Sequence, residues 1–260
     1  MTYLGSFILG MLCLCGPQAV AQAVVCGGDY VCLVAAAADA DAPSDSPLAP
    51  TERPASPEHC PGVAVTVTAA SQDERNLACS AVGDIVKRLD RCGISLRRPL
   101  HVHIINEVRH PFGGVIFGLL DTKNERVLVT REANIASLVK DTPYAALPPR
   151  DFYRSLIVHE VVHGVMHQNL RRPATSHAAY EYPAYALQIE SLAPNVRDAF
   201  LQSFDPPTMA AASLFNDPVL FFDPYHFAAR AYHHFKASGD GCAHLAALLG
   251  GEVAFIAPSL

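Results

Sequence analysis

The 260-residue sequence predicts an α+β fold, with a small sheet in the first half of the folded region and mostly helical structure in the second. Three observations lead to this prediction. Runs rich in β-branched residues and separated by turn residues occur over 63–130, apolar residues recur at helical spacing from about residue 148 onward, and hydrophobic residues make up 50% of the chain. Strands that come first and helices that come later are typical of an α+β domain.

The N-terminus predicts a signal peptide over residues 1–23. Its apolar run of about a dozen residues ends near Cys15 and is too short to span a bilayer. The triplet at 21–23 reads Ala-Gln-Ala, a small-x-small cleavage pattern, although no Lys or Arg precedes the run, and a buried N-terminal helix is the alternative. We expect cleavage after Ala23, a secreted or periplasmic location, and no stable membrane insertion of the mature chain.

Residues 24–59 are predicted to be a Cys-containing segment followed by a disordered linker. The linker at 35–58 is rich in Ala, Pro, Ser and Asp, with almost no large apolar side chain. Six cysteines remain after signal cleavage, an even number that fits three disulfides in an oxidising compartment. They are Cys26, Cys32, Cys60, Cys79, Cys92 and Cys242. Fifteen pairings are possible, and our choice is Cys79 with Cys92, which flank the second half of a predicted helix.

The folded domain is predicted over residues 60–260. Its first half reads as a strand at 63–68, a helix at 71–91 that stops before Gly93, a strand at 100–105, and a hairpin made by 115–120 and 126–130. The segment from 246 to the C-terminus is small and apolar, so we expect it to close the core. The net charge of −6 and the lack of a Lys/Arg run argue against nucleic acid as a partner.

One predicted helix carries a metal-binding pattern, His159-Glu160-Val-Val-His163. Residues four apart on a helix lie about 40° apart and one turn along, so both imidazoles can reach one metal from the same face. Glu160 lies about 100° round from His159, where its carboxylate can reach a metal-activated water without being a ligand. Shuffled chains of this composition would show the pattern roughly 2% of the time, and the alternative is a helix whose histidines face solvent or bond within the core.

A catalytic zinc ion needs a third protein ligand beside two histidines. Glu181 is our choice, because it lies on the next predicted helix, a turn and an antiparallel return away, and because a carboxylate beside two imidazoles suits zinc. The other candidates are His167, His177 and Glu190. His167 is too far along a straight helix from His159 to share its ion, since the rise between them is about 12 Å.

The motif with a downstream Glu181 resembles the gluzincin branch of zinc metallopeptidases, and is most similar to small exported bacterial members. The resemblance covers residues 63–192 and implies a zincin-like fold in which a hairpin edge strand binds extended peptide by backbone pairing. It implies Zn²⁺ on His159, His163 and Glu181, with Glu160 as the general base. The chain departs from the family in having Pro183 two residues after the proposed ligand and no N-E-x-x-S-D extension.

The resemblance implies an exported zinc-dependent peptidase that hydrolyses peptide bonds in a peptide or protein substrate. The tetrahedral oxyanion would need a hydrogen-bond donor. Candidate donors are Tyr180, Tyr182, Tyr185, His226, Tyr232, His233 and His234. Two alternatives stand beside this function: an inactive zincin-fold protein that binds metal and a partner, and a zinc hydrolase of a non-peptide bond. A second metal on His101 and His103, which share a strand face, is less favoured than an exposed strand face, and a Cys26 switch on zinc is less favoured than a disulfide.

Overall fold

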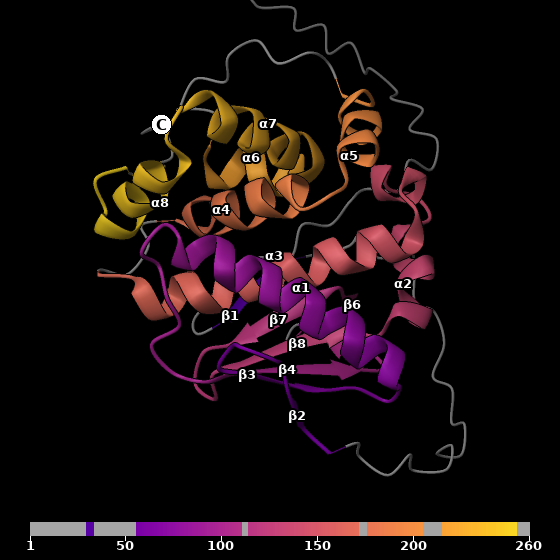
Figure 1. Cartoon of the computed structure of the whole chain (residues 1–260). Coiled ribbons are helices and arrows are strands. Elements are labelled where there is room, and N and C mark those ends of the chain that lie inside the picture. The colour runs from indigo at the N-terminus through magenta and orange to yellow at the C-terminus, as the bar shows by residue number, and fades with distance from the viewer. Residues whose placement is uncertain (1–29, 34–55, 111–113, 172–175, 205–214, 254–260) are drawn as a thin grey trace, which may run out of the picture.

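The computed structural model describes residues 30–33, 56–110, 114–171, 176–204 and 215–253. Within these ranges a mixed sheet is covered on one face by two long helices, and a further helical layer lies above them (Figure 1). The predicted signal peptide, its cleavage site after Ala23, and Cys26 lie outside the described residues. None of the helices described is long and apolar enough to cross a membrane.

The main sheet has six strands in the order β1-β7-β8-β4-β3-β2. They are β1 (Tyr30–Leu33), β2 (Glu58–His59), β3 (Val65–Thr68), β4 (Leu100–Ile105), β7 (Gly118–Asp121) and β8 (Arg126–Thr130). The central strand β4 is parallel to both β3 and β8, and the remaining pairs are antiparallel. Two short strands, β5 (Val108–Arg109) and β6 (Val115–Ile116), pair separately. The expected strand, helix, strand and hairpin are therefore present in their expected order.

The hairpin differs from the prediction at its outer side. Its first strand begins at Gly118, not at Val115, and β1 pairs antiparallel along the side of β7 that was expected to be the sheet edge. The prediction of a hairpin edge strand is therefore wrong, because a strand from the N-terminal segment 24–59 takes that place. The same segment also supplies β2. No sequence pattern indicated this pairing, since a long-range strand partner leaves no local periodicity.

Helices make up most of the chain after the sheet. They are α1 (Gln72–Asp90), α2 (Glu132–Val139), the 3₁₀ helix η1 (Pro143–Ala146), α3 (Pro149–Asn169), α4 (His177–Glu190), α5 (Pro194–Leu201), α6 (Asp217–Phe222), α7 (Pro224–Ala237) and α8 (Gly241–Gly250). Ser71 caps α1 by accepting a hydrogen bond from the Glu74 amide, and Ser176 caps α4 by accepting one from Ala179. Leu248 and Leu249 of α8 are buried, in line with the expectation for the first part of the C-terminal segment, whose residues 254–260 lie outside the described residues.

The central helix is α3, which lies between the sheet and α4 and also contacts α1 (Figure 1). A helix enclosed in this way is buried on nearly all sides, and sixteen of its residues are buried. Gly164 allows its close approach to β4, because a Cβ there would lie 2.8 Å from Leu100 Cδ2. The face of α3 that carries His159 and His163 is therefore not open to solvent, because α4 covers it.

Two disulfides join distant parts of the described chain. Cys60 pairs with Cys79 and ties the start of the sheet to α1. Cys92 pairs with Cys242 and ties the end of α1 to α8. The predicted Cys79–Cys92 pair is therefore wrong: helical neighbours were chosen, whereas each cysteine meets a partner from another element. Two of the three expected disulfides are therefore present, whereas the remaining cysteines, Cys26 and Cys32, have no described side chains.

Candidate metal centre

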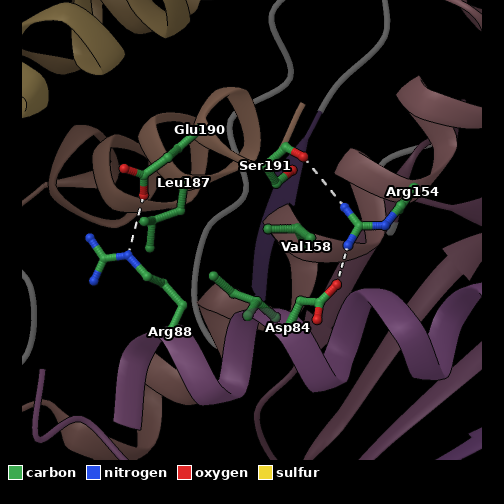
Figure 2. Close-up of a pocket in the computed structure, with 8 residues that line it drawn as sticks. Asp84, Arg88, Arg154, Val158, Leu187, Glu190 and Ser191 are labelled. Atoms are coloured by element: carbon green, nitrogen blue, oxygen red, sulfur yellow. Dashed lines mark hydrogen bonds and ion pairs between the residues drawn. The ribbon is translucent and has the colours of Figure 1, made fainter. Parts of the chain in front are cut away.

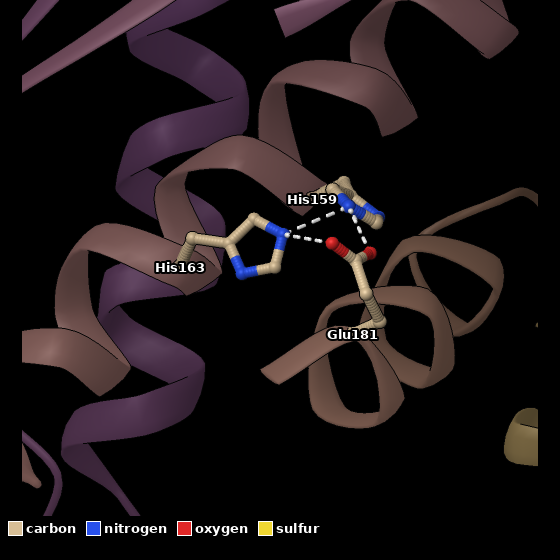
Figure 3. Close-up of side chains that lie close together, drawn as sticks. All are labelled: His159, His163 and Glu181. Atoms are coloured by element: carbon tan, nitrogen blue, oxygen red, sulfur yellow. Dashed lines mark hydrogen bonds and ion pairs between the residues drawn. The ribbon is translucent and has the colours of Figure 1, made fainter. Parts of the chain in front are cut away.

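His159, His163 and Glu181 converge on one point between α3 and α4 (Figure 3). The Nε2 atoms of the two histidines are 3.0 Å apart. Glu181 Oε2 is 3.2 Å from His159 Nε2, and its Oε1 is 3.5 Å from His163 Nε2. The two helices bring these side chains together as predicted, because α3 turns its i and i+4 residues toward α4 while α4 returns antiparallel above it.

These distances leave room for a single metal ion among the three side chains. Bonds of about 2.0–2.2 Å at tetrahedral angles place ligand atoms about 3.3–3.6 Å from one another. The two Nε2 atoms are 3.0 Å apart and lie 3.2 and 3.5 Å from different oxygens of Glu181, and one ligand atom from each residue can be chosen so that all three lie within 4.8 Å of one another. The donor set of two imidazoles and one carboxylate is also one that zinc accepts at catalytic sites. The triad could therefore hold a metal ion.

The electrostatics of the triad favour the protonation states that bind metals. Burial lowers the pKa of His159, which keeps its imidazole neutral. Burial alone would raise the pKa of Glu181, but the charge of His163 and hydrogen bonds from both histidines outweigh it and lower the pKa to about 2. A metal ion competes with protons for its ligands, so it would take the place of the protons through which His159 and His163 contact the ionised carboxylate of Glu181.

Glu160 lies beside the triad without taking part in it. Its side chain is fully buried, and neither carboxylate oxygen has a hydrogen-bond partner among the described residues. Burial and the charge of Glu181 raise its pKa well above the usual value for a glutamate. Burying a carboxylic group without a partner costs several kcal/mol, so this orphaned carboxylate indicates a water molecule or ligand as its partner.

Of the seven candidate donors, Tyr185 is the one packed on the triad. Its ring stands edge-on to His159 with the ring centroids 4.7 Å apart. Burial raises the pKa of Tyr185, and the charges of Glu181 and Glu160 add to the effect, so its hydroxyl is within electrostatic reach of both carboxylates. Tyr144 of η1, which sequence reasoning missed, adds a buried hydroxyl without a partner in the described chain, and Glu181 contributes to its raised pKa after burial and Tyr225.

The remaining candidate donors have other contacts in the structure. Tyr182 shares a hydrogen bond with His234, whose ring also contacts Phe215. His226 is 2.8 Å from Asp223. Tyr232 and His233 pack on each other, and Arg197 lies over the Tyr232 ring. Tyr180 is half-buried at the start of α4.

The alternative ligands do not join the triad. His177 pairs with Asp217, and Glu190 pairs with Arg88 and Lys236. His167 lies in the last turn of α3, apart from the converging group. The hydroxyl of Thr66 on β3 lies 2.5 Å from Nδ1 of His101 on β4, and the described residues bring no third ligand to His101 and His103.

A separate pocket of about 230 Å³ opens between α1, α3 and α4 (Figure 2). Its lining residues are Asp84, Ile85, Arg88, Arg154, Val158, Leu187, Glu190 and Ser191. Arg88 pairs with Glu190 at 3.5 Å and Arg154 with Asp84 at 2.5 Å, so both guanidinium groups are neutralised within the protein. The pocket therefore offers no unpaired charge for a ligand, and the triad does not line it.

Comparison with known proteins gives one match. The model of a family of unknown function, DUF6639, matches residues 65–258, a range that includes the sheet from β3 onward and both helices of the triad. No curated protein and no solved structure matches the chain.

Proposed function

This chain belongs to the DUF6639 family, and we propose that it is an exported zinc-dependent hydrolase of peptide bonds. The observation that carries the proposal is the position of Glu160. A purely structural metal site needs only its ligands, whereas here a second carboxylate, that of Glu160, is buried beside the triad with both oxygens unpartnered in the described structure. The cost of that burial is explained if Glu160 handles a proton during turnover.

Each residue at the site has a role in the proposed reaction. A zinc ion held by His159, His163 and Glu181 would supply Lewis acidity, which polarises a carbonyl oxygen and lowers the pKa of water. Glu160 would take the proton of the attacking water onto its carboxylate and pass it to the leaving amine. Tyr185 would donate its hydroxyl proton in a hydrogen bond to the oxyanion.

Complete burial of the triad favours a second candidate, a protein that binds metal without turnover. His159 and His163 are at most 1% exposed, and Glu181 is 4% exposed. A substrate would therefore reach the site only after part of its cover moves, and β1 already occupies the strand position next to β7. A metal site without a substrate path would serve stability or partner binding instead.

The test compares the purified mature chain, with its disulfides intact, with a Glu160→Gln variant. We expect about one zinc per chain in both proteins, because Glu160 is not a ligand. Hydrolysis of a denatured-protein substrate should be present in the unmodified chain and lost in the variant. Equal hydrolysis in both proteins would remove Glu160 as the base, and zinc without hydrolysis in the unmodified chain would favour the binding protein.

A further inference from the structure

The Nδ1 side of the His159 ring is held by a chain of hydrogen bonds through residues that are not candidate metal ligands. His159 Nδ1 lies 3.0 Å from Gln188 Oε1, and Gln188 Nε2 lies 3.5 Å from Ser155 Oγ. Ser155 Oγ in turn donates to the backbone oxygen of Phe152 at 2.8 Å. Gln188 and Ser155 are each 1% exposed, so water does not substitute for these bonds.

The helices place these hydrogen bonds on the side of the His159 ring that faces away from the proposed metal ion. Gln188 lies seven residues after Glu181 on α4, which is two helical turns along the same face. Ser155 lies four residues before His159 on α3, again on one face. Glu181 therefore meets one edge of the His159 ring and Gln188 the other, at 3.2 and 3.0 Å.

The hydrogen-bond donors of Ser155 and Gln188 determine which ring nitrogen of His159 carries the proton. Ser155 has a single hydroxyl proton, and the Phe152 carbonyl accepts it. Ser155 can then only accept from Gln188, so the amide nitrogen faces Ser155 and the amide oxygen faces His159. A carbonyl oxygen has no proton to give, so the Nδ1 atom of His159 must be the donor. When a metal ion binds, the neutral ring then keeps its single proton on Nδ1, and Nε2 supplies the coordinating lone pair on the side of Glu181 and His163.

We propose that Gln188 is a positioning residue that selects the metal-binding form of His159. The inference rests on the proposed function, because it concerns the hydrogen bond that Gln188 makes with His159, one of the proposed metal ligands. Partners of this kind fix the ring and the proton position of metal-bound histidines, and their loss typically weakens metal binding about 10–100-fold. Here a neutral amide fills the role, braced by a serine from the helix that carries the histidine.

The test measures Zn²⁺ affinity by competition with a chromophoric chelator for the full mature chain and three variants. Gln188→Met removes the acceptor at similar size, and should weaken Zn²⁺ binding about 10–100-fold. Gln188→Glu keeps an acceptor oxygen and should restore affinity to within about threefold of the unmodified chain. Gln168→Met is the matched control, because Gln168 is a buried glutamine too, but it lies on α3 and accepts hydrogen bonds from the Arg97 and Arg98 amides. The Zn²⁺ affinity of this variant should equal that of the unmodified chain.

A second measurement needs no variant. Long-range ¹H–¹⁵N spectra of the zinc-loaded protein should show His159 protonated at Nδ1 and coordinated through Nε2. Coordination through Nδ1, or unchanged Zn²⁺ affinity in Gln188→Met while the unmodified chain binds zinc, overturns the role of Gln188 alone. Failure of the unmodified chain to bind zinc overturns the metal site and the positioning role together.

Discussion

The backbone of Gly118 lies directly against the carboxylate of Glu160. A Cβ at position 118 would be 2.5 Å from Glu160 Oε1 and 2.6 Å from its Cγ, distances that real Cβ atoms do not adopt. Strand β7 can therefore pass the proposed base only because residue 118 has no side chain. The position of the hairpin therefore affects the position of the Glu160 carboxylate on α3.

Replacing Gly118 by Ala is expected to displace Glu160. Hydrolysis should fall at least about tenfold, since a shift of about 1 Å in a reacting group has costs of this order or larger, while zinc content stays unchanged. The thermal midpoint should fall as well, and it should recover in Gly118→Ala/Glu160→Ala, where the shorter side chain makes room. The matched control is Gly83→Ala, because a Cβ there meets nothing within 4 Å and alanine favours the helix. A Gly118→Ala protein with full activity and an unchanged midpoint would contradict this arrangement.

Tyr185→Phe tests the proposed oxyanion donor. The variant keeps the ring that packs on His159 but loses the hydroxyl, so Zn²⁺ affinity should stay the same. We expect kcat to fall about 100-fold, the usual loss when one oxyanion donor is removed. Tyr182→Phe on the same helix serves as control, because its hydroxyl bonds His234 instead. Equal kcat values in Tyr185→Phe and the unmodified chain would exclude this hydroxyl from the proposed reaction.

The two disulfides should contribute unequally to stability. Cys92 and Cys242 are separated by 150 residues, and Cys60 and Cys79 by 19. On the chain-entropy model the longer loop constrains the unfolded chain more, by about 1.8 kcal/mol at 25 °C. Denaturant unfolding of the two double Cys→Ser variants checks the order. Greater destabilisation from losing Cys60–Cys79 would show that native contacts, not loop length, decide the effect.

Asp121 makes folding sensitive to acid. Burial alone would raise its pKa, but hydrogen bonds from Asn124 and Arg126 outweigh this and lower it below the ordinary value of 3.8. A lowered pKa in the folded state stabilises the protein above pH 3.8, and the contribution is lost as the pH falls through the folded-state pKa. Asp121→Asn should therefore cost about 1 kcal/mol at neutral pH and progressively less in acid. Chemical unfolding of the unmodified chain and the variant at several pH values measures this loss. A difference in free energy of unfolding that stays constant with pH would show that the charge of Asp121 is not its cause.

Local patterns predicted most of the elements, and contacts between distant segments were the part they could not reach. Helical spacing placed α1 and α3, and the i, i+4 histidines with a carboxylate on the next helix identified the three side chains that converge. The partner of β7 and both disulfide pairings depend on segments far apart in sequence, which leave no periodicity. Gln188 reads as one more polar residue near the end of a helix, and only its position seven residues after Glu181 could have indicated a shared face.

Gly118 and Tyr144 illustrate why the surroundings of the site were also out of reach. A glycine in a strand signals close approach by some group, but the sequence does not say that the group is Glu160. Tyr144 comes from η1, a short element before the motif helix. Its position near Glu181 depends on how η1 is placed relative to α4, which the sequence does not show. The predicted signal peptide and its cleavage after Ala23 stay predictions, as do the peptide substrate and zinc as the metal.

The central claim is that His159, His163 and Glu181 together hold one metal ion. Metal analysis after dialysis against a weak chelator tests it most directly, on the unmodified chain, on Glu181→Ala, and on Glu190→Ala as a control from the same helix. We predict about one zinc per chain in the unmodified protein and the control, and at least about tenfold weaker retention in Glu181→Ala. An unmodified chain without metal, or a Glu181→Ala chain that holds zinc equally well, would contradict the account.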